Sequence, residues 1–156
     1  MNALVLTISD RASRGEGVDT SGPAAVELLA TAGIEADLDV VGDGVNVVAQ
    51  RLRQAVSMRR PLVITTGGTG VAERDQTPEA TLLVVDREVP GLAEAMRSAT
   101  FGRLPAGMLG RGVAGIAGNT LIVNLPGSEK AVRESMEIVL PAIPHAIQLL
   151  AGDTEH

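Results

Sequence analysis

The sequence contains no cysteine, and this absence removes several kinds of chemistry at once. A disulfide framework, a thiolate metal site and a cysteine nucleophile are all excluded. The lack of cysteine also fits a reducing compartment. The first ten residues have no basic segment followed by a cleavage signal, and the longest apolar runs are strand-length, too short to span a membrane. We therefore expect a cytoplasmic protein with no membrane partner.

Aromatic and lysine side chains are almost as scarce. The chain has no tryptophan, no tyrosine and one phenylalanine, Phe101, so it offers little surface on which nucleic-acid bases would stack. The formal net charge of −6 also opposes binding to a phosphate backbone, and we expect no nucleic acid among the partners. The basic residues are nearly all arginine, with Lys130 the lone lysine. Some arginines adjoin glycine-rich turns, where small anions could still be held: Arg14, Arg74 and Arg111.

The chain does have enough hydrophobic residues to form one core. Its 156 residues are 45% hydrophobic, with a mean hydropathy of +0.22. This size and composition are typical of one compact domain. We find no linker, internal repeat or low-complexity segment, and we expect a single domain over residues 1–156.

Strand-like and helix-like segments alternate along the first half of the chain. Residues 3–8 and 61–66 are continuous apolar runs, typical of strands buried on both faces. Residues 34–40 alternate apolar and acidic residues, which favours a strand at a sheet edge. Helical spacing lies between these strands, at 21–33 and 45–56. Right-handed crossovers then predict an α/β fold, a three-layer α/β/α arrangement with a mostly parallel sheet.

The second half predicts more helices and a short hairpin. Helical spacing covers about residues 77–87 and begins again at Leu92. Residues 113–125 have the pattern of two strands joined by a tight turn at 118–119. A last helical pattern begins at Ser128.

A glycine-rich loop follows the strand at 61–66, in the stretch LVITTGGTGVAERDQTPEAT. Ligands on parallel sheets bind beyond the carboxyl ends of the strands, and glycines let a backbone approach phosphate oxygens closely. The loop is not a Walker A loop, because Gly-Lys-Ser/Thr is missing. It is not a dinucleotide fingerprint, because Glu73 replaces the third glycine. The alternative interpretation is a tight turn with no ligand.

Because this loop has no lysine, Mg²⁺ is the natural substitute for neutralising bound phosphates. Mg²⁺ prefers one or two carboxylates together with substrate phosphates, and three aspartates follow segments that end at the same sheet edge: Asp10, Asp43 and Asp75. The two histidines, His145 and His156, lie far from these loops in the sequence, so nothing indicates histidine catalysis.

Three other segments have ordinary structural interpretations when each is taken alone. Thr77 and Pro78 form a helix start, with the threonine capping and the proline at the first helical position. Residues 124–128, NLPGS, form a strand-to-helix turn that also offers free N–H groups to an anion. Asp37 and Asp39 are predicted to be a solvated strand face.

Taken together, these motifs resemble a known family. TISDR, GD, TTGGTG followed by RDQTPEAT, EVPGLAEAMR, RGVAGI and NLPGS occur in this order. In order and spacing they look like the molybdenum cofactor biosynthesis family, whose members include MogA, MoaB and the G domain of gephyrin. The resemblance covers nearly the whole chain. A lone GGTG loop is weak evidence, but GGTG with the later Arg-Asp-x-Thr-Pro and Asn-x-Pro-Gly is specific.

The resemblance implies a function and an assembly. Such proteins form homotrimers or dimers of trimers and bind molybdopterin. MogA-like members are molybdopterin adenylyltransferases, which transfer AMP from Mg-ATP to the molybdopterin phosphate and release pyrophosphate. A molybdenum-insertion protein is then an implied later partner. The alternative is a MoaB-type protein that binds or carries the pterin without using ATP, and the motifs are shared by both classes.

Carried over residue by residue, the resemblance assigns roles. Asp75 and Asp43 would be catalytic, holding Mg²⁺ or aligning the reacting phosphates. The glycine loop would cradle ligand phosphate, and other motif positions would line the site; together these are Gly67, Gly68, Thr69, Gly70, Ser9, Asp10, Asn124, Pro126, Gly127 and Ser128. Two positions depart from the family pattern. Gly110 stands where a serine hydroxyl would be available to ligand, and Leu92 replaces an aromatic residue.

A phospho-acceptor receiver domain is a third hypothesis, because it also places acidic residues after the first strand. It requires an aspartate at the end of the third strand. This chain has Thr66 and Gly67 there, so the sequence favours the other two hypotheses.

Overall fold

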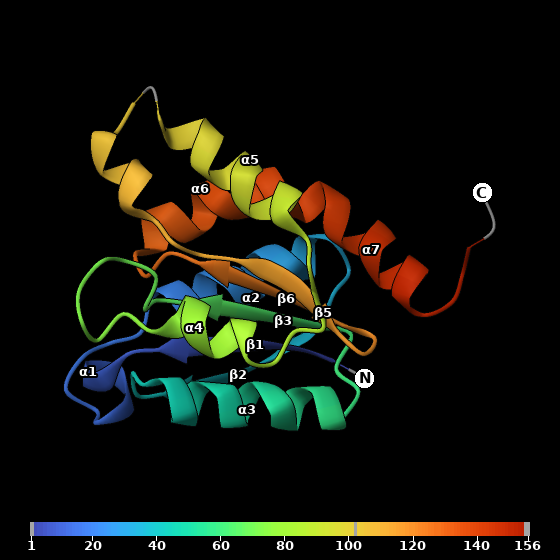
Figure 1. Cartoon of the computed structure of the whole chain (residues 1–156), viewed down its shortest axis with the longest axis horizontal. Coiled ribbons are helices and arrows are strands. Elements are labelled where there is room, and N and C mark those ends of the chain that lie inside the picture. The colour runs from blue at the N-terminus through green and yellow to red at the C-terminus, as the bar shows by residue number, and fades with distance from the viewer. Residues whose placement is uncertain (1, 102, 155–156) are drawn as a thin grey trace.

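A six-stranded sheet forms the centre of the molecule in a computed structural model that describes residues 2–101 and 103–154 (Figure 1). The strand order is β2-β1-β3-β6-β5-β4. The strands are β1 (Ala3–Ile8), β2 (Ala36–Val41), β3 (Leu62–Thr66), β4 (Arg87–Glu88), β5 (Ala114–Ala117) and β6 (Thr120–Leu125). β2, β1, β3 and β6 run parallel, whereas β5 and β4 are antiparallel to their neighbours. His156 lies outside the described residues.

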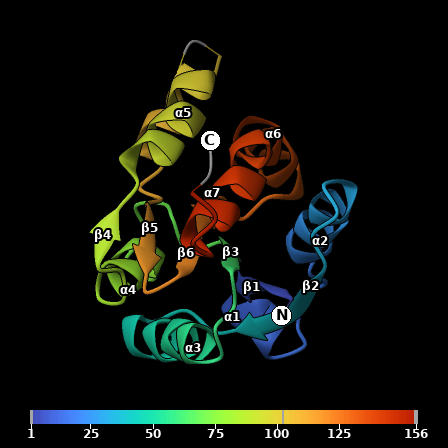
Figure 2. The same cartoon turned by 90° about the vertical axis from the view of Figure 1, so that its right-hand side faces the viewer.

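Helices cover both faces of this sheet, as Figure 2 shows. The α-helices are α1 (Asp10–Ser13), α2 (Ser21–Thr31), α3 (Val45–Ser57), α4 (Thr77–Leu82), α5 (Pro90–Phe101), α6 (Glu129–Val139) and α7 (Ile143–Leu150), with 3₁₀ turns η1 (Pro105–Leu109) and η2 (Leu140–Ala142). α3 and α4 pack on one face, and α2, α5 and α6 pack on the other. The predicted three-layer α/β/α fold with a mostly parallel sheet is therefore confirmed.

Alternate residues of β1 supply the two halves of the core. Ala3 and Val5 pack in the cluster with α2 and α6, whereas Leu4 and Leu6 pack in the cluster with α3. All four are at most 1% exposed, which is why the strand is a continuous apolar run. Burying one leucine in this way contributes about 1.5–3 kcal/mol relative to leaving it exposed. The sheet is thus held rigidly from both sides, and its carboxyl edge can position loops.

The region between β3 and β5 differs from its prediction. The helix predicted over 77–87 ends at Leu82, and a two-residue strand, β4, follows it. The Asp86 amide donates to the Ile116 carbonyl at 2.7 Å, so pairing with β5 overrides the local helical pattern. α5 then begins at Pro90 instead of Leu92, because proline is well suited to a first helical turn. The predicted hairpin is confirmed, with β5 and β6 flanking the turn at 118–119.

The acidic residues of β2 form an exposed face, as predicted, with side chains that are 52% exposed at Asp37 and 43% exposed at Asp39, and both are also ion-paired. β2 is an edge strand, as its alternation predicted. Asp37 pairs with Arg60, and Asp39 accepts from Arg51 Nε at 2.7 Å. These hydrogen bonds lower the pKa of both carboxyls. The partners come from α3 and from the turn that follows it, which the alternating pattern of β2 does not indicate.

In the part of the chain that the structure describes, every helix is too short or too polar to cross a membrane.

Candidate functional site

A polar cavity of about 380 Å³ lies at the carboxyl edge of β1 and β3, lined in part by residues of α1. Many of the predicted site residues line it, although they come from four separate loops: Ser9, Asp10, Asp43, Gly67, Gly68, Asp75 and Gly127. Parallel strands that end at one edge bring these loops together. The prediction that they lie close together is confirmed.

A second cavity, of about 300 Å³, lies on the other side of the glycine loop. Its walls are mainly apolar and come from α5, η1 and α6, with Met96, Leu104, Leu109 and Ile138 among them. Other predicted residues line this cavity instead of the polar one: Thr69, Gly70, Asn124 and Pro126. The loop GGTG is therefore the wall between the two cavities, with Gly67 and Gly68 facing one and Thr69 and Gly70 facing the other.

The first two glycines of this loop have backbone conformations that other residues rarely adopt. Gly67 has φ of +93° and Gly68 has φ of +68°. A Cβ on Gly67 would collide with the Ile8 carbonyl oxygen, and a Cβ on Gly127 would lie 3.3 Å from Gly67 Cα. The loop thus passes tightly between the end of β1 and the turn after β6. Glycine is required here for the turn itself, and the same two residues line the polar cavity.

Thr77 fixes the glycine loop instead of capping a helix, so the capping prediction was wrong. α4 begins at Thr77, and its N-cap residue is Gln76. The Thr77 hydroxyl donates to the Gly67 carbonyl at 2.9 Å, and the Thr77 amide donates to the Gly68 carbonyl at 3.0 Å. Thr77 is 1% exposed, so these bonds are shielded from water. Thr77, at the start of α4, therefore holds the glycine loop in position through two hydrogen bonds.

Three carboxylates converge on the polar cavity. The Asp10 amide donates to Asp43 Oδ2 at 3.2 Å, and the Asp43 amide donates to Asp10 Oδ1 at 2.9 Å. The Ala72 amide donates to Asp75 Oδ2 at 3.0 Å. Burial raises the pKa of Asp43, and the charges of Asp10 and Asp75 raise it further, against the opposing effects of the Asp10 amide and of Arg74. Negative charge is thus concentrated where the loops meet.

These residues fit a Mg²⁺ ion that arrives with a phosphate substrate. The pKa of Asp43 is raised because its carboxylate is partly buried and lies near other carboxylates. A nearby cation would stabilise the charged form of these groups. Among the described residues, no group of three acidic, histidine or cysteine side chains is arranged to hold a metal ion. Mg²⁺ needs only one or two carboxylates, because phosphate oxygens and water complete its shell.

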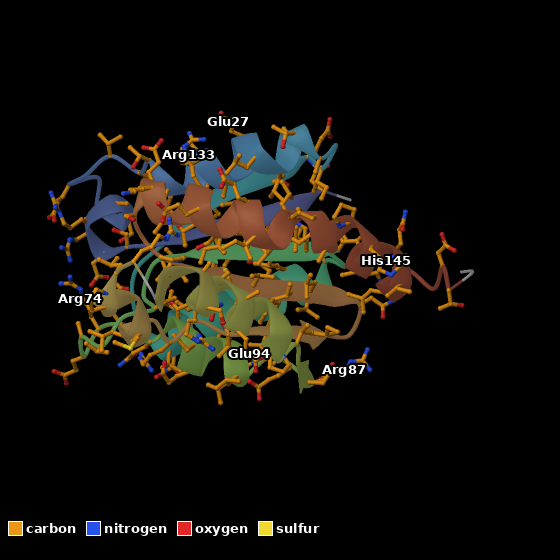
Figure 3. All side chains as sticks on the ribbon, turned by 90° about the horizontal axis from the view of Figure 1, so that it is seen from above. Glu27, Arg74, Arg87, Glu94, Arg133 and His145 are labelled. Atoms are coloured by element: carbon orange, nitrogen blue, oxygen red, sulfur yellow. The ribbon has the colours of Figure 1, made fainter. Side chains whose placement is uncertain are left out.

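Three arginines line the polar cavity, whereas Arg111 is hydrogen-bonded to backbone carbonyls of the protein. Arg11, Arg14 and Arg74 line the cavity. Figure 3 shows Arg74 at the opposite end of the molecule from His145, in agreement with the expectation that this histidine is remote. Arg111 was expected to be available to small anions, yet it donates to the carbonyls of Gly70 at 2.7 Å and Asp75 at 2.6 Å. Its side chain thus binds protein groups, and this expectation is corrected.

Two of the predicted residues make structural hydrogen bonds. The buried Asn124 amide donates at 3.0 Å to the hydroxyls of Thr65 and Thr81, while its Oδ1 accepts from the Val113 amide at 3.1 Å. Ser128 is the N-cap of α6, accepting from the Ala131 amide at 3.2 Å. Asn124 lines the apolar cavity with its polar atoms already bonded, and Ser128 orients the helix that forms one wall of that cavity.

Sequence reasoning missed a second carboxylate system at the polar cavity. Asp19 accepts from the Thr7 hydroxyl at 2.7 Å, the Ser21 hydroxyl at 3.1 Å and the Gly22 amide at 3.0 Å. Ser21 in turn bonds the Thr66 hydroxyl at 3.0 Å, next to the glycine loop. The signal was the Asp-Thr-Ser-Gly stretch before α2, where an aspartate precedes a helix start.

Comparison with known proteins places these features in a family. Residues 4–145 match the model described as a probable molybdopterin binding domain. The molybdopterin adenylyltransferase of Helicobacter pylori is 41% identical over 153 residues, which cover 96% of this chain and 87% of that protein. Gephyrin of Dictyostelium discoideum is 40% identical over 157 residues, covering 94% of this chain but only 22% of its own length.

A solved structure agrees with both the sequence match and the fold. The MoaB protein of Thermus thermophilus is 47% identical, has a TM-score of 0.87, and is matched over 97% of this chain and 96% of its own. The resemblance to MogA and MoaB is therefore confirmed. With the family model matching most of the chain and its glycine loop, aspartates and NLPG turn meeting at one edge, this protein belongs to the molybdopterin-binding domain family.

Proposed function

We propose that this protein is a molybdopterin adenylyltransferase that takes part in molybdenum cofactor biosynthesis. The observation that carries the proposal is the pair of cavities on opposite sides of one glycine loop. One is polar and surrounded by carboxylates and arginines, and the other is mainly apolar. Two chemically different substrates can then meet at a shared backbone wall, as transfer of AMP from ATP to molybdopterin requires.

The polar cavity takes the nucleotide and the apolar cavity takes the flat pterin. Gly67 and Gly68 line the polar cavity, and Thr69 and Gly70 line the apolar cavity. Arg11 and Arg74 supply positive charge for the triphosphate. The pterin phosphate would then reach the glycine loop from the apolar cavity, where Thr69 and Gly70 lie.

The reaction is a nucleotidyl transfer that needs no protein nucleophile. An oxygen of the pterin phosphate bonds to the α-phosphorus, the bond to the bridging oxygen breaks, and pyrophosphate leaves with the electron pair. Asp43 and Asp75 would hold Mg²⁺, which supplies charge neutralisation when bound. The chain itself contributes position and preorganised donors, which are sources of catalysis that suit a site without cysteine or histidine.

The second candidate is a carrier of the MoaB type, which binds molybdopterin and does not use ATP. The high identity to the Thermus thermophilus MoaB protein favours it, and so does Gly110, which lines the apolar cavity without a hydroxyl. The carboxylates favour the enzyme, because a carrier has no need to gather Asp10, Asp43 and Asp75 beside a phosphate loop.

We further propose that the protein assembles as a homotrimer or a dimer of trimers and passes its product to a molybdenum-insertion protein. Exposed apolar side chains at Leu82 and Leu83 support assembly, because they adjoin the unpaired sheet edge formed by β4. Light scattering at micromolar concentration would report a trimer or hexamer mass, and a persistent monomer would contradict the proposal.

The function is tested with purified protein, Mg-ATP and molybdopterin. We expect pyrophosphate release and a pterin product heavier by one AMP, seen by mass spectrometry. Omitting the pterin or adding a chelator should abolish both signals. Molybdopterin binding with pyrophosphate release at background would identify the carrier instead, and failure to bind the pterin would refute both candidates.

A further inference from the structure

We propose that Arg111 is a positioning residue that fixes both sides of the glycine wall at once, so that the two substrates are aligned with each other. The reaction part of this inference rests on the proposed function. The structural part stands on the hydrogen bonds of one guanidinium, which reach both the loop segment beside the apolar cavity and the segment that carries Asp75.

Three contacts connect Arg111 to the loop between β3 and α4, and a fourth connects it to α4 itself. Its amide donates to the Thr69 carbonyl at 2.9 Å, and Nε donates to the Gly70 carbonyl at 2.7 Å. A terminal nitrogen donates to the Asp75 carbonyl at 2.6 Å. The other terminal nitrogen pairs with the carboxylate of Glu79, on α4. One side chain therefore spans the loop from the apolar side to the carboxylate side.

The contacts also explain why this residue is arginine. The guanidinium is a planar fork with fixed donor directions, so three acceptors at different places can be held only in one relative geometry. The pairing with Arg111 lowers the pKa of Glu79, which keeps this carboxylate charged. The described walls of both cavities are formed without Arg111, so it acts on substrates through the loop and not by contact.

The segment that Arg111 holds is otherwise exposed. Val71 is 65% exposed, and residues 72–74 are also exposed. Within the segment, the Ala72 amide bonds the Asp75 carboxylate at 3.0 Å and the Asp75 amide bonds the Ala72 carbonyl at 2.9 Å. These local bonds fix the shape of the turn, but not its place relative to the cavities. Arg111 fixes that place together with Thr77, which bonds the Gly67 and Gly68 carbonyls, and Gln76, whose side chain accepts from the Val45 amide at 3.0 Å.

The segment between η1 and β5, which carries Arg111, is itself held in place by hydrogen bonding and close packing. Arg97, on α5, donates to the Gly112 carbonyl at 2.8 Å. A Cβ on Gly112 would lie 3.3 Å from the Asn124 carbonyl oxygen, so the segment runs close against β6. Arg111 therefore extends from a rigid base, which is what a positioning side chain requires.

The test compares Arg111→Met, Arg111→Lys and a matched control, Arg133→Met, in the full chain. Arg133 pairs with Glu27 on α2 and Glu129 on α6, beside Glu27 in Figure 3, and it lines neither cavity. For Arg111→Met we expect kcat for pyrophosphate release to fall by about 10²-fold, because small misplacements have effects of this size, with KM for each substrate changed far less. Arg111→Lys keeps the charge without the fork and should recover only part of kcat. Arg133→Met should match the parent.

Amide hydrogen exchange in residues 69–76 gives a readout that needs no reaction. Faster exchange confined to this segment in Arg111→Met, with a melting temperature close to that of Arg133→Met, supports the inference. Unchanged exchange, or a loss of protection spread over the whole chain, overturns it. If the parent binds molybdopterin but releases no pyrophosphate, the proposed enzyme fails, and the exchange result still decides whether Arg111 fixes the wall.

Discussion

The two cavities on either side of the glycine loop are built from different materials. Backbone turns and carboxylates at the ends of strands make the polar cavity, whereas side chains of three helical segments make most of the apolar one. The turns at the ends of the strands are therefore held by the sheet behind them, whereas the exposed segment that carries Asp75 is held by side-chain contacts such as that of Arg111. The ligand preference of the apolar cavity can instead be changed by substituting single side chains of its lining. In the proposed function, reaction chemistry and ligand choice therefore belong to separate cavities that share the glycine loop.

The largest expected effect is on the polar side. Asp75→Asn keeps the acceptor for the Ala72 amide but removes the charge. If the carboxylate holds Mg²⁺ or aligns the phosphates, pyrophosphate release should fall on the order of 10²-fold or more, which corresponds to about 2.7 kcal/mol of barrier. Pterin affinity should change much less, which a binding titration on the same variant would show.

A matched control for this variant is Asp86→Asn. Asp86 also accepts a backbone amide, from Gly118 at 2.7 Å, but it lies at the β5–β6 hairpin, outside both cavities. Its turnover should equal that of the parent. Unchanged turnover in Asp75→Asn would remove Asp75 from the proposed metal site.

The next effect tests the shared wall. Gly68→Ala places a methyl group against the Thr77 side chain at a φ of +68°. Strain in this left-handed conformation costs about 1–2 kcal/mol, and the collision adds to it. We expect a lower melting temperature and weaker binding of both ATP and molybdopterin. Loss of affinity for only one ligand would show that the cavities do not share this wall.

A smaller, one-sided effect is expected on the apolar side. Gly110→Ser introduces the hydroxyl that the family pattern has, and a Cβ there meets the Gly107 carbonyl at an ordinary 3.4 Å. One added hydrogen bond contributes about 0.5–1.5 kcal/mol, so molybdopterin affinity should rise several-fold. ATP affinity should stay at the parent value. Calorimetric titration of both ligands would check this, and an equal change in both affinities would contradict the separation of the cavities.

The smallest effect is expected away from both cavities, at the edge strand β2. The pKa values of Asp37 and Asp39 are lowered below their ordinary 3.8 by hydrogen bonds from Arg60 and Arg51. A carboxyl with a lowered folded-state pKa stabilises the fold above the ordinary value, and this contribution disappears as the pH falls through the folded-state pKa. The melting-temperature difference between the parent and an Asp37→Asn, Asp39→Asn variant should therefore be small at neutral pH, shrink as the pH falls below 3.8, and vanish once the pH is below the lowered folded-state pKa values. A difference that persists in acid would show that it does not come from these charges.

The polar side was the more predictable from sequence, for a physical reason. Turns that need glycine, and aspartates that follow strands, are encoded by consecutive residues, so Gly67, Gly68 and Asp75 could be identified directly. The buried strands could be identified in the same way, because burial on both faces leaves a continuous apolar run.

The apolar cavity and the role of Arg111 could not be predicted in this way. Met96 and Ile138 meet only because α5 and α6 pack on the same face of the sheet, and no local pattern encodes that meeting. Arg111 adjoins a glycine turn as a phosphate-binding arginine would, and only the tertiary arrangement places Gly70 and Asp75 carbonyls around it. The short strand β4 was missed for a related reason, since its pairing with β5 is a long-range contact.

The short glycine loop that borders both cavities also suggests a strategy for inhibitor design. Gly67 and Gly70 face opposite cavities although they are only a few residues apart in the chain. A compound that joins an anionic group to a flat apolar ring through a very short linker would therefore reach both cavities. Linking the two halves makes binding of the second half intramolecular, so affinity rises by effective concentration without any new contact. The wall that we propose to align two substrates is thus a target for a single bisubstrate molecule.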